Sequence, residues 1–534
     1  MIRRLALLGG VLLALAAVAG FALSAKPAAS HATVSAGQAA EVTSVTRSCP
    51  PSAPGAGAAH IAMIAVPPQA ASSSTAGPAK TAGPAKTGGA VPAGSATVSS
   101  VPAALGPPAA NPAKGKPTAD GTPTPGTTST PGTTSTSKRA STAKSAPAAP
   151  VTVAVPGAAS TVAAPGGGDG AGTSVSATGQ MAEGFEAEQA DSTGMGLVSC
   201  SHPSSDLWFV GSGEPDVWLY LTNSGTAQAS VDVTILTDTG QQSGLANAIT
   251  VAPNQVIAEN VSPYVHGAQA VALHVQTSSG QIAASVWEGT GAGKGAWLPQ
   301  SAAPSTTVVI PGLTVASSSA RLFVTVPGAA DAQLKVVAYT PAGAHAQFDS
   351  TTTPVQASAA ATTPVTLSSL GASAAGLELT SNVPIVAGVL VPGAGIGSFT
   401  AGADPVTDQG VVAGNPAGRG LTIGLLLTAP RSAATASVSV IASDGTVTSP
   451  AALQDVAVAG GHTLAVAVPR PSSRESFAIV LTPRPGSGPL YAARVVTSGT
   501  GGLSAAVTSL LPVQSALTEI TLPPVQNAYT AVLP

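Results

Sequence analysis

Charged and aromatic residues are both scarce in this chain. Of its 534 residues only 8% are Asp, Glu, Lys or Arg and 3% are Phe, Trp or Tyr, although 44% are hydrophobic. Average proteins carry about 25% charged residues, and helices usually rely on Glu, Lys and Arg to solvate their outer face. The shortage of charge disfavours a helical protein, whereas Val, Thr and Ser between Gly and Pro turns favour β-strands.

Motifs for catalysis, metals and nucleotides are missing from the sequence. The seven histidines do not pair at ligand spacing, and there is no G-x-S-x-G, H-E-x-x-H or Walker loop. Asp404 and Asp408 do not form a calcium-loop pattern. A basic face with stacking aromatics, which nucleic-acid binding requires, is absent as well. We therefore expect a protein that is not an enzyme, with no cofactor, no metal and no nucleic-acid partner.

The N-terminus carries the clearest local signal, because Arg3 and Arg4 precede an uncharged apolar run from Leu5 to Ala25. About 21 residues at ~1.5 Å each can cross a hydrocarbon core of ~30 Å, whereas a signal peptide has a shorter apolar region. Residues 1–25 are therefore expected to be either a retained transmembrane signal anchor or a cleaved signal peptide. In both cases the rest of the chain is exported, membrane-anchored or secreted, because the positive end stays in the cytoplasm.

Cys49 and Cys200 are the two cysteines of the chain. Outside the cytoplasm a disulfide persists, so a bond between them is expected, with two free buried thiols as the alternative. Residues 26–42 are expected to form a short tether and residues 43–66 a β segment. Residues 67–174 are rich in Pro, Thr, Ala and Gly and repeat short motifs, so they are expected to be disordered. If the cysteines pair, residues 43–66 belong to the first folded domain, and the disordered stretch is a loop of that domain instead of a stalk.

A threefold repeat organises the remainder of the chain. The interval from Leu219 to Leu322 is 103 residues, and the interval from Leu322 to Leu425 is the same. Units of ~100 residues with several alternating strands suit immunoglobulin-like sandwiches. The sequence therefore predicts an all-β protein with about three tandem immunoglobulin-like β-sandwiches, at residues 175–303, 304–405 and 406–534, the last including a C-terminal tail.

Two groups of residues are candidates for a site. The acidic stretch of residues 181–191 has four carboxylates, which are compatible with a metal site or a general acid, but a solvated strand edge or turn is expected because no His or Asn accompanies them. The second group is aromatic and falls in or beside the first repeat. Large aromatics usually fill a core, and the alternative is an exposed platform that stacks on sugar rings. The aromatic candidates are Trp208, Trp218, Tyr220, Trp287 and Trp297.

Four short motifs carry a resemblance to a known family. They are residues 47–50 (RSCP), 181–189 (MAEGFEAEQ), 200–203 (CSHP) and 208–211 (WFVG). With them the chain resembles an uncharacterised actinobacterial family of exported, membrane-linked proteins, itself a domain of unknown function, over roughly residues 42–511. The resemblance implies an extracytoplasmic location and transfers no catalytic residue.

These features predict a non-enzymatic cell-envelope protein with a structural or protein-interaction role. Its expected partners are the membrane, through the N-terminal helix, and envelope proteins or wall glycan. The alternative is a module that binds cell-wall carbohydrate through the aromatic residues of the first repeat. An enzyme is the least favoured interpretation, because His, Asp and Glu are so few.

Overall fold

The computed structural model forms two compact units, Met1–Glu41 with Glu519–Pro534, and Val42–Thr518. In the first unit, β1 (Gln38–Glu41) pairs antiparallel with β37 (Glu519–Leu522). The second unit, called the body below, holds all other strands among the described residues. The structure describes residues 38–66, 94–104, 149–165, 170–191, 196–243, 245, 248–290, 294–314, 320–348, 355–367, 374–392, 396–418, 420–472, 475–504, 506–516 and 519–522.

The described residues are nearly all β, which confirms the fold class predicted from the low charge and the Val and Thr content. Their helical elements are one turn of α-helix, α2 (Ser262–Val265), and three 3₁₀ turns at Gly179–Met181, Ala451–Leu453 and Gly502–Ser504. No helix in the described part of the chain is long and apolar enough to cross a membrane. The expected anchor or signal peptide at residues 1–25 lies outside the described residues.

Sandwich A is built from the N-terminal part of the body. Its two sheets have the strand orders β2-β7-β4-β5 and β6-β3-β8-β9, and all their pairings are antiparallel. Ile61, Met63, Val98, Val175 and Phe185 fill the space between the sheets. The strands are β2 (Ser44–Cys49), β3 (His60–Ala65), β4 (Ala96–Val101), β5 (Val151–Val153), β6 (Ser160–Ala163), β7 (Gly172–Thr178), β8 (Phe185–Ala190) and β9 (Leu197–Ser199).

Sandwich B follows, with the sheets β13-β12-β16-β10-β19 and β15-β11-β17-β18, and with β14 paired to β12. Its core contains the alternate residues of each strand, such as Leu219 and Leu221 of β11, as a period-2 pattern requires. The strands are β10 (Asp206–Gly211), β11 (Asp216–Asn223), β12 (Ala229–Thr237), β13 (Gly240–Gln242), β14 (Ile249–Val251), β15 (Gln255–Asn260), β16 (Val271–Ser279), β17 (Ala283–Gly289), β18 (Gly295–Leu298) and β19 (Gln300–Ser301).

Sandwich C is distinguished by β26, a strand of 17 residues that joins its two layers. The first half of β26 pairs with β20 and β22, and the second half pairs with β21 and β27. The strands are β20 (Ser305–Leu313), β21 (Arg321–Val326), β22 (Ala332–Thr340), β23 (Gly343–Ala346), β24 (Val355–Ala357), β25 (Ala361–Thr366), β26 (Ala375–Val391) and β27 (Ser398–Ala401).

Sandwich D completes the body with the sheets β28-β34-β30-β31, to which β32 adds, and β33-β29-β35-β36. Leu425, Leu427, Val438 and Phe477 are among the residues of its core. The strands are β28 (Gly410–Asn415), β29 (Leu421–Ala429), β30 (Ala434–Ile441), β31 (Val447–Thr448), β32 (Val456–Val458), β33 (His462–Ala467), β34 (Phe477–Pro483), β35 (Tyr491–Ser498) and β36 (Ala506–Pro512).

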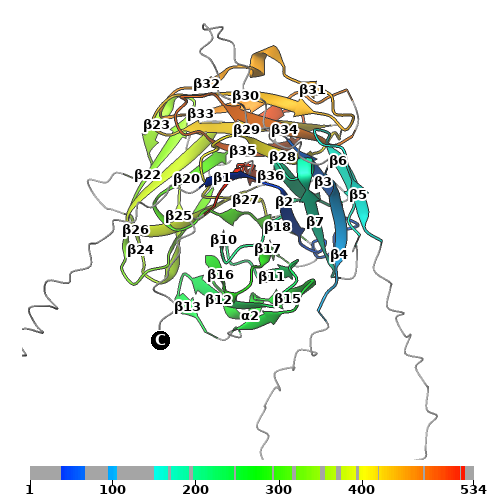
Figure 1. The fold of residues 1–534 in the computed structure, drawn as a ribbon. Coiled ribbons are helices and arrows are strands. Elements are labelled where there is room, and N and C mark those ends of the chain that lie inside the picture. Colours follow the sequence, from blue (N-terminus) through cyan, green and yellow to red (C-terminus); the bar gives the residue numbers. More distant parts are fainter. Residues whose placement is uncertain are drawn as a thin grey trace, which may run out of the picture. The chain divides into compact units, whose positions relative to one another are not determined.

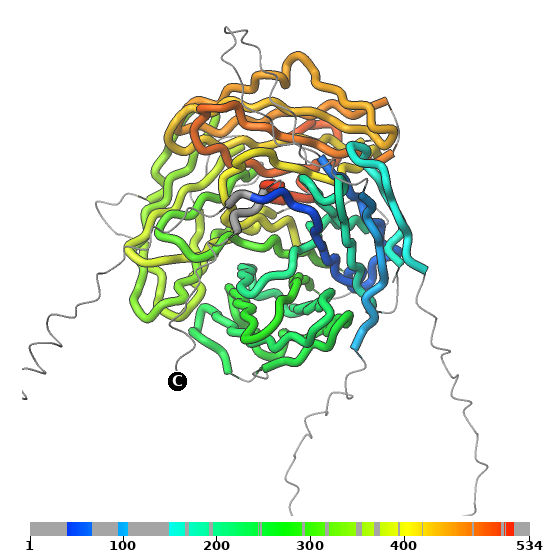
Figure 2. The backbone as a smooth tube through the Cα atoms, viewed as in Figure 1, coloured from blue at the N-terminus to red at the C-terminus, as the bar shows by residue number. Residues whose placement is uncertain are grey.

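The four sandwiches of the body contact one another in a closed cycle, whose strands are labelled in Figure 1 and whose backbone is traced in Figure 2. At every interface, buried apolar residues of two neighbouring sandwiches pack against each other. Sandwich D packs against A as well as against C. Closing the cycle removes apolar sheet faces from water at both ends of the series. Residues that represent the two sides of each interface are Val101 and Trp287 (A and B), Val210 and Phe323 (B and C), Ile310 and Leu426 (C and D), and Ile64 and Val411 (D and A).

The prediction of disorder over residues 67–174 is wrong in part. Strands β4, β5 and β6, and the start of β7, lie in this range, and the side chains of Ala96, Val98 and Val101 are fully buried. Small Ala and Val side chains fit a tightly packed sheet, and the pairing of β4 with β7 satisfies the backbone. The remaining residues of this range, apart from the short segments around these strands, lie outside the described residues.

The predicted first sandwich at residues 175–303 spans parts of two sandwiches. Its N-terminal part, β8 and β9, belongs to A, and its remainder forms B. The β segment of residues 43–66 pairs with β7, β8 and β6, so it builds A and adds no strand to the sheets of B. The 103-residue repeat did not reveal sandwich A, because low-complexity sequence separates the strands of that sandwich.

Candidate ligand cavity

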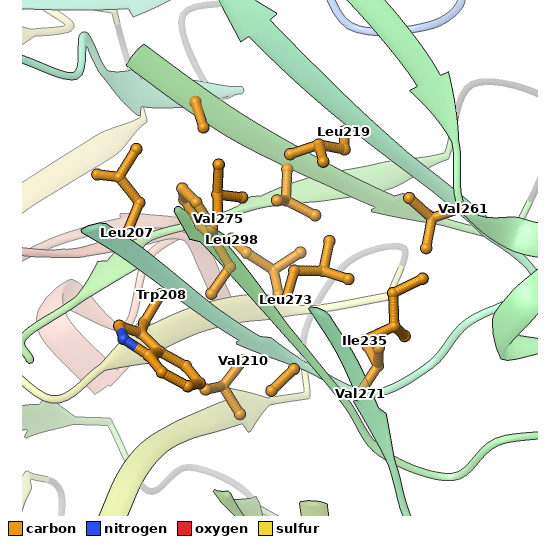
Figure 3. Packing of buried hydrophobic residues seen from close by; sticks show 14 of the residues in the cluster. Leu207, Trp208, Val210, Leu219, Ile235, Val261, Val271, Leu273, Val275 and Leu298 are labelled. Carbon is orange, nitrogen blue, oxygen red and sulfur yellow. The ribbon is translucent and has the colours of Figure 1, made fainter. Parts of the chain in front are cut away.

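Trp208 lies on the outer face of sandwich B, against sandwich C. Figure 3 shows Trp208 and Val210 on the opposite side of their strand from Leu207, which points into the core of B. The indole stacks on the imidazole of His274, with ring centroids 3.7 Å apart and an interplanar angle of 12°. Sandwich C contributes Phe323 and Phe399 to the same apolar cluster, so Trp208 is an interface residue.

Tyr220, Trp287 and Trp297 fill the interface between sandwiches A and B. The rings of Trp287 and Trp297 pack edge to face at 5.3 Å, and Tyr220 lies 5.7 Å from Trp297. Val101 and Val198 of A cover them. These three rings are buried, as is that of Trp208, so they bind sandwiches together and present no surface on which a sugar could stack.

Trp218 is the partly exposed member of the five aromatics. Its indole Nε1 donates a hydrogen bond of 2.7 Å to the carboxylate of Asp216. One ring of this kind beside four buried rings does not form a platform. Neither sequence interpretation, domain core or exposed platform, anticipated that the aromatics lie between sandwiches.

The disulfide between Cys49 and Cys200 is present, as predicted. The cysteines are 151 residues apart in sequence, their Cα atoms are 4.3 Å apart, and both are buried in the core of sandwich A. Next to them, the backbone nitrogen of Ser48 donates to the carbonyl of Ser201 at 2.8 Å. The bond therefore ties β2, the first strand of A, to the segment that leads from A to B.

The prediction that the acidic stretch is a solvated edge or turn is wrong for two of its carboxylates, whereas Glu183 does lie in a turn and is partly exposed. Glu186 and Glu188 lie on β8 and are both buried. Glu186 forms an ion pair with Arg47 of β2, and Glu188 forms one of 2.9 Å with Arg494 of sandwich D. Local sequence patterns could not predict this burial, because the two arginine partners lie far away in sequence. Among the described residues no group of three His, Cys, Asp or Glu side chains could hold a metal ion.

A cavity of about 300 Å³ lies where the segments between the sandwiches meet. His202 comes from the A–B segment, Gln300–Ala302 from the B–C segment, and Gly402–Asp404 from the C–D segment. Pro512 at the end of β36, the three residues that follow it, and Arg47 of β2 complete the wall. Equivalent points of the sequence repeat therefore converge on one space. Arg47 and His202 lie in two of the short motifs of the family resemblance, residues 47–50 and 200–203, but nothing in the sequence indicated that they share a cavity with the other wall residues.

Arg47 and His202 are placed by the disulfide. Arg47 precedes Cys49 by two residues, and His202 follows Cys200 by two residues, with the Ser48–Ser201 bridge between. Both side chains line the cavity. The guanidinium of Arg47 donates to Glu186 and, at 3.3 Å, to the carbonyl of Phe185, but its Nε has no acceptor among the described residues.

The electrostatics of the cavity wall are mixed. Burial raises the pKa of the Glu186 carboxyl, and the positive charge of Arg47 opposes that rise. His202 lines the cavity as an exposed residue, and partial dehydration by the surrounding protein, together with Arg47, lowers the pKa of its imidazole. His202 is therefore neutral at neutral pH. Asp404 adds a carboxylate to the wall, and Gln300 and Gln514 add amides.

A family model described as a family of unknown function (DUF5719) matches residues 157–469, more than half of the chain. The chain belongs to this family. No curated protein and no solved structure matches it. The DUF5719 region begins in sandwich A, before β6, and ends after β33 of D. It includes His202, Gln300 and Asp404, whereas Arg47 and residues 512–515 lie outside it.

Proposed function

We propose that this chain is an exported, non-enzymatic protein of the cell envelope with a structural or protein-interaction role. The proposal includes an N-terminal anchor or signal at residues 1–25, the actinobacterial origin implied by the resemblance, and an immunoglobulin-like character for the sandwiches. Two antiparallel layers in about 100 residues per sandwich support that character. The buried Cys49–Cys200 bond supports a compartment outside the reducing cytoplasm.

The observation that carries the interaction role is a group of exposed valines at sheet edges. Val151 of β5 is 40% exposed, Val447 of β31 is 54% exposed, and Val155 follows β5 at 56%. They are the exposed large hydrophobic residues of the described chain. Both β5 and β31 are edge strands, of sandwiches A and D respectively.

These two edges belong to neighbouring parts of the body. After β5, the backbone nitrogen of Ala159 donates to the carbonyl of Ala442 at 3.2 Å, just before β31. An edge strand with an apolar side chain exposes unpaired backbone groups that a strand of another protein can join. We therefore assign the interaction surface to the A–D edge, with an extended peptide segment of a partner protein as its ligand.

Photo-crosslinking in cells of the native host tests this role. A photoreactive amino acid replaces Val151 or Val447, and in the control it replaces Thr250, an exposed residue on the edge strand β14 of sandwich B. We expect the photoreactive residue to give one defined adduct at either valine position and none at Thr250. When the photoreactive residue stands at one of the two valines and Lys replaces the second, the adduct should disappear. Identical adducts from all three positions, or none from the valines, would contradict an interaction surface here.

The aromatic residues do not favour carbohydrate binding as a second function. That alternative requires exposed rings, and Trp208, Tyr220, Trp287 and Trp297 are buried at interfaces. A sugar-binding role for these side chains therefore has no support in the structure.

A further inference from the structure

We propose that the cavity lined by Arg47, His202 and Asp404 is a binding site for a neutral, hydroxyl-rich molecule of the size of a monosaccharide. This inference goes beyond the interaction role of the A–D edge and does not depend on it. It rests on the volume of the cavity, on the hydrogen-bonding groups in its wall and on the rigidity of the elements that carry them.

The volume suits one small ligand. About 300 Å³ lies at the lower end of the ~300–1,000 Å³ range of ligand pockets and equals the share of roughly ten water molecules in the liquid. A single sugar ring or a polyol of similar size fits such a space, whereas an oligosaccharide does not fit it as a whole. The expected ligand is a free small molecule or the terminal unit of a chain.

Arg47 brings a positive charge to the wall of this cavity. The residue is 4% exposed, and its guanidinium donates to Glu186 and to the carbonyl of Phe185. Because Arg47 lines the cavity, an oxygen atom of a bound molecule is favoured over an apolar group beside it.

The charges of the wall select a neutral ligand. The ion pair with Glu186 neutralises part of the positive charge of Arg47, so Arg47 attracts a bound anion only weakly. The carboxylate of Asp404 repels an anion, and the guanidinium of Arg47 repels a cation. A hydroxyl group both donates and accepts, so it can accept from the guanidinium, donate to a carboxylate, and pair with the amides of Gln300 and Gln514.

The wall is also preorganised. Arg47 lies on a strand of sandwich A, held by its ion pair with Glu186 and by the disulfide two residues away. Ser301 donates to the carbonyl of Gly402, and the backbone nitrogen of Ala302 donates to the same carbonyl at 2.8 Å. Two of the converging segments are thus bonded to each other. A site whose groups are fixed before binding loses little entropy when it takes up a ligand.

Saturation-transfer NMR on the purified, oxidised full chain tests the site. The neutral probes are D-glucose, D-mannose, N-acetylglucosamine and myo-inositol. The charged probes are citrate and choline, whose signals are observed directly, and inorganic phosphate, which is added as a competitor. The variants are Asp404→Asn and His202→Gln. Asp408→Asn is the matched control, an exposed carboxylate four residues from Asp404 that does not line the cavity. Thermal unfolding checks that every variant is folded.

We expect at least one neutral probe to give a signal with the wild type and with Asp408→Asn. Asp404→Asn should weaken its binding about tenfold or more, as expected for the loss of a hydrogen bond to a charged group, and His202→Gln should weaken it about threefold to tenfold, as expected for a neutral hydrogen bond. Silence from the whole neutral panel, binding of only the charged probes, or a sugar signal that survives both cavity variants would each overturn the proposal. These outcomes are independent of the crosslinking at Val151 and Val447.

Discussion

Arg494 of β35 and Glu188 of β8, 306 residues apart in sequence, form an ion pair of 2.9 Å between sandwiches D and A. The arginine is fully buried, and it also donates to the carbonyl of Gly414 at 2.7 Å. The backbone nitrogen of Gly414 in turn donates to Glu188. The three groups close the cycle of sandwiches, and they link the last part of the body to the first.

Breaking this pair from one side should destabilise the body strongly. In Arg494→Met the carboxylate of Glu188 stays buried without its cation, and such a change typically costs about 3–5 kcal/mol. The double variant Glu188→Gln/Arg494→Met removes both charges and should recover part of that loss. Urea unfolding followed by circular dichroism measures the difference between the two.

The matched control is Arg484→Met. Arg484 pairs with Asp455 at 2.7 Å, but both side chains are largely exposed, so the loss should stay below about 1 kcal/mol. Equal losses from Arg494→Met and Arg484→Met would show that the D–A interface does not depend on the buried pair.

The sequence predicted the β class and the disulfide, because both depend on local composition and on a residue type that occurs only twice. It did not predict the partners of Glu186 and Glu188, since Arg47 and Arg494 are separated from them by more than a hundred residues. The cavity was missed for the same reason. Arg47, His202 and Asp404 come from different segments, and only the cycle of sandwiches brings them together.

Removing the disulfide should lower the stability of sandwich A. In the chain-entropy model, a bond that closes a loop of 151 residues stabilises by about 5 kcal/mol, and strain or residual structure reduces the effect. We expect the double variant Cys49→Ser/Cys200→Ser to lose about 2–5 kcal/mol in urea unfolding. A protease site inserted in residues 105–148 gives a second readout on denaturing gels. The two fragments should separate only with reductant, and separation without it would contradict the bond.

Glu288 should make stability depend on pH. Burial raises the pKa of its carboxyl, against the opposing hydrogen bonds from the backbone of Glu214 and from Ser212. A raised pKa means that the folded state binds the proton more tightly than the unfolded state. Its contribution is therefore complete below the ordinary pKa of 4.5 and is lost as pH rises through the folded pKa, with a slope of at most about 1.4 kcal/mol per pH unit.

Urea unfolding at several pH values compares the wild type with Glu288→Gln, which cannot titrate at this position. The difference in unfolding free energy between the two proteins should shift in favour of the variant as the pH rises above 4.5. A difference that stays constant with pH would show that Glu288 does not titrate with a raised pKa.

The tryptophan emission of the body should be that of buried rings. Trp208, Trp287 and Trp297 are buried, and Trp218 is partly exposed, so acrylamide should quench mainly Trp218. Trp218→Phe should remove most of the quenchable fraction at little cost in stability, whereas Trp287→Ala should cost about 3–5 kcal/mol. Quenching that is undiminished in Trp218→Phe would mean that an interface of sandwich B, with A or with C, is open in solution.

We propose that the body is an oxidised scaffold outside the cytoplasm, and the state of its two cysteines in cells tests this proposal most directly. Cells of the native host are lysed in acid, and the denatured chain is treated with a thiol-reactive polyethylene glycol that adds visible mass to each free cysteine. We predict no added mass for the full chain without reductant, two additions after reduction, and two additions without reductant when residues 1–25 are deleted. Two free thiols in the full chain, or an oxidised pair that does not need residues 1–25, would contradict the account.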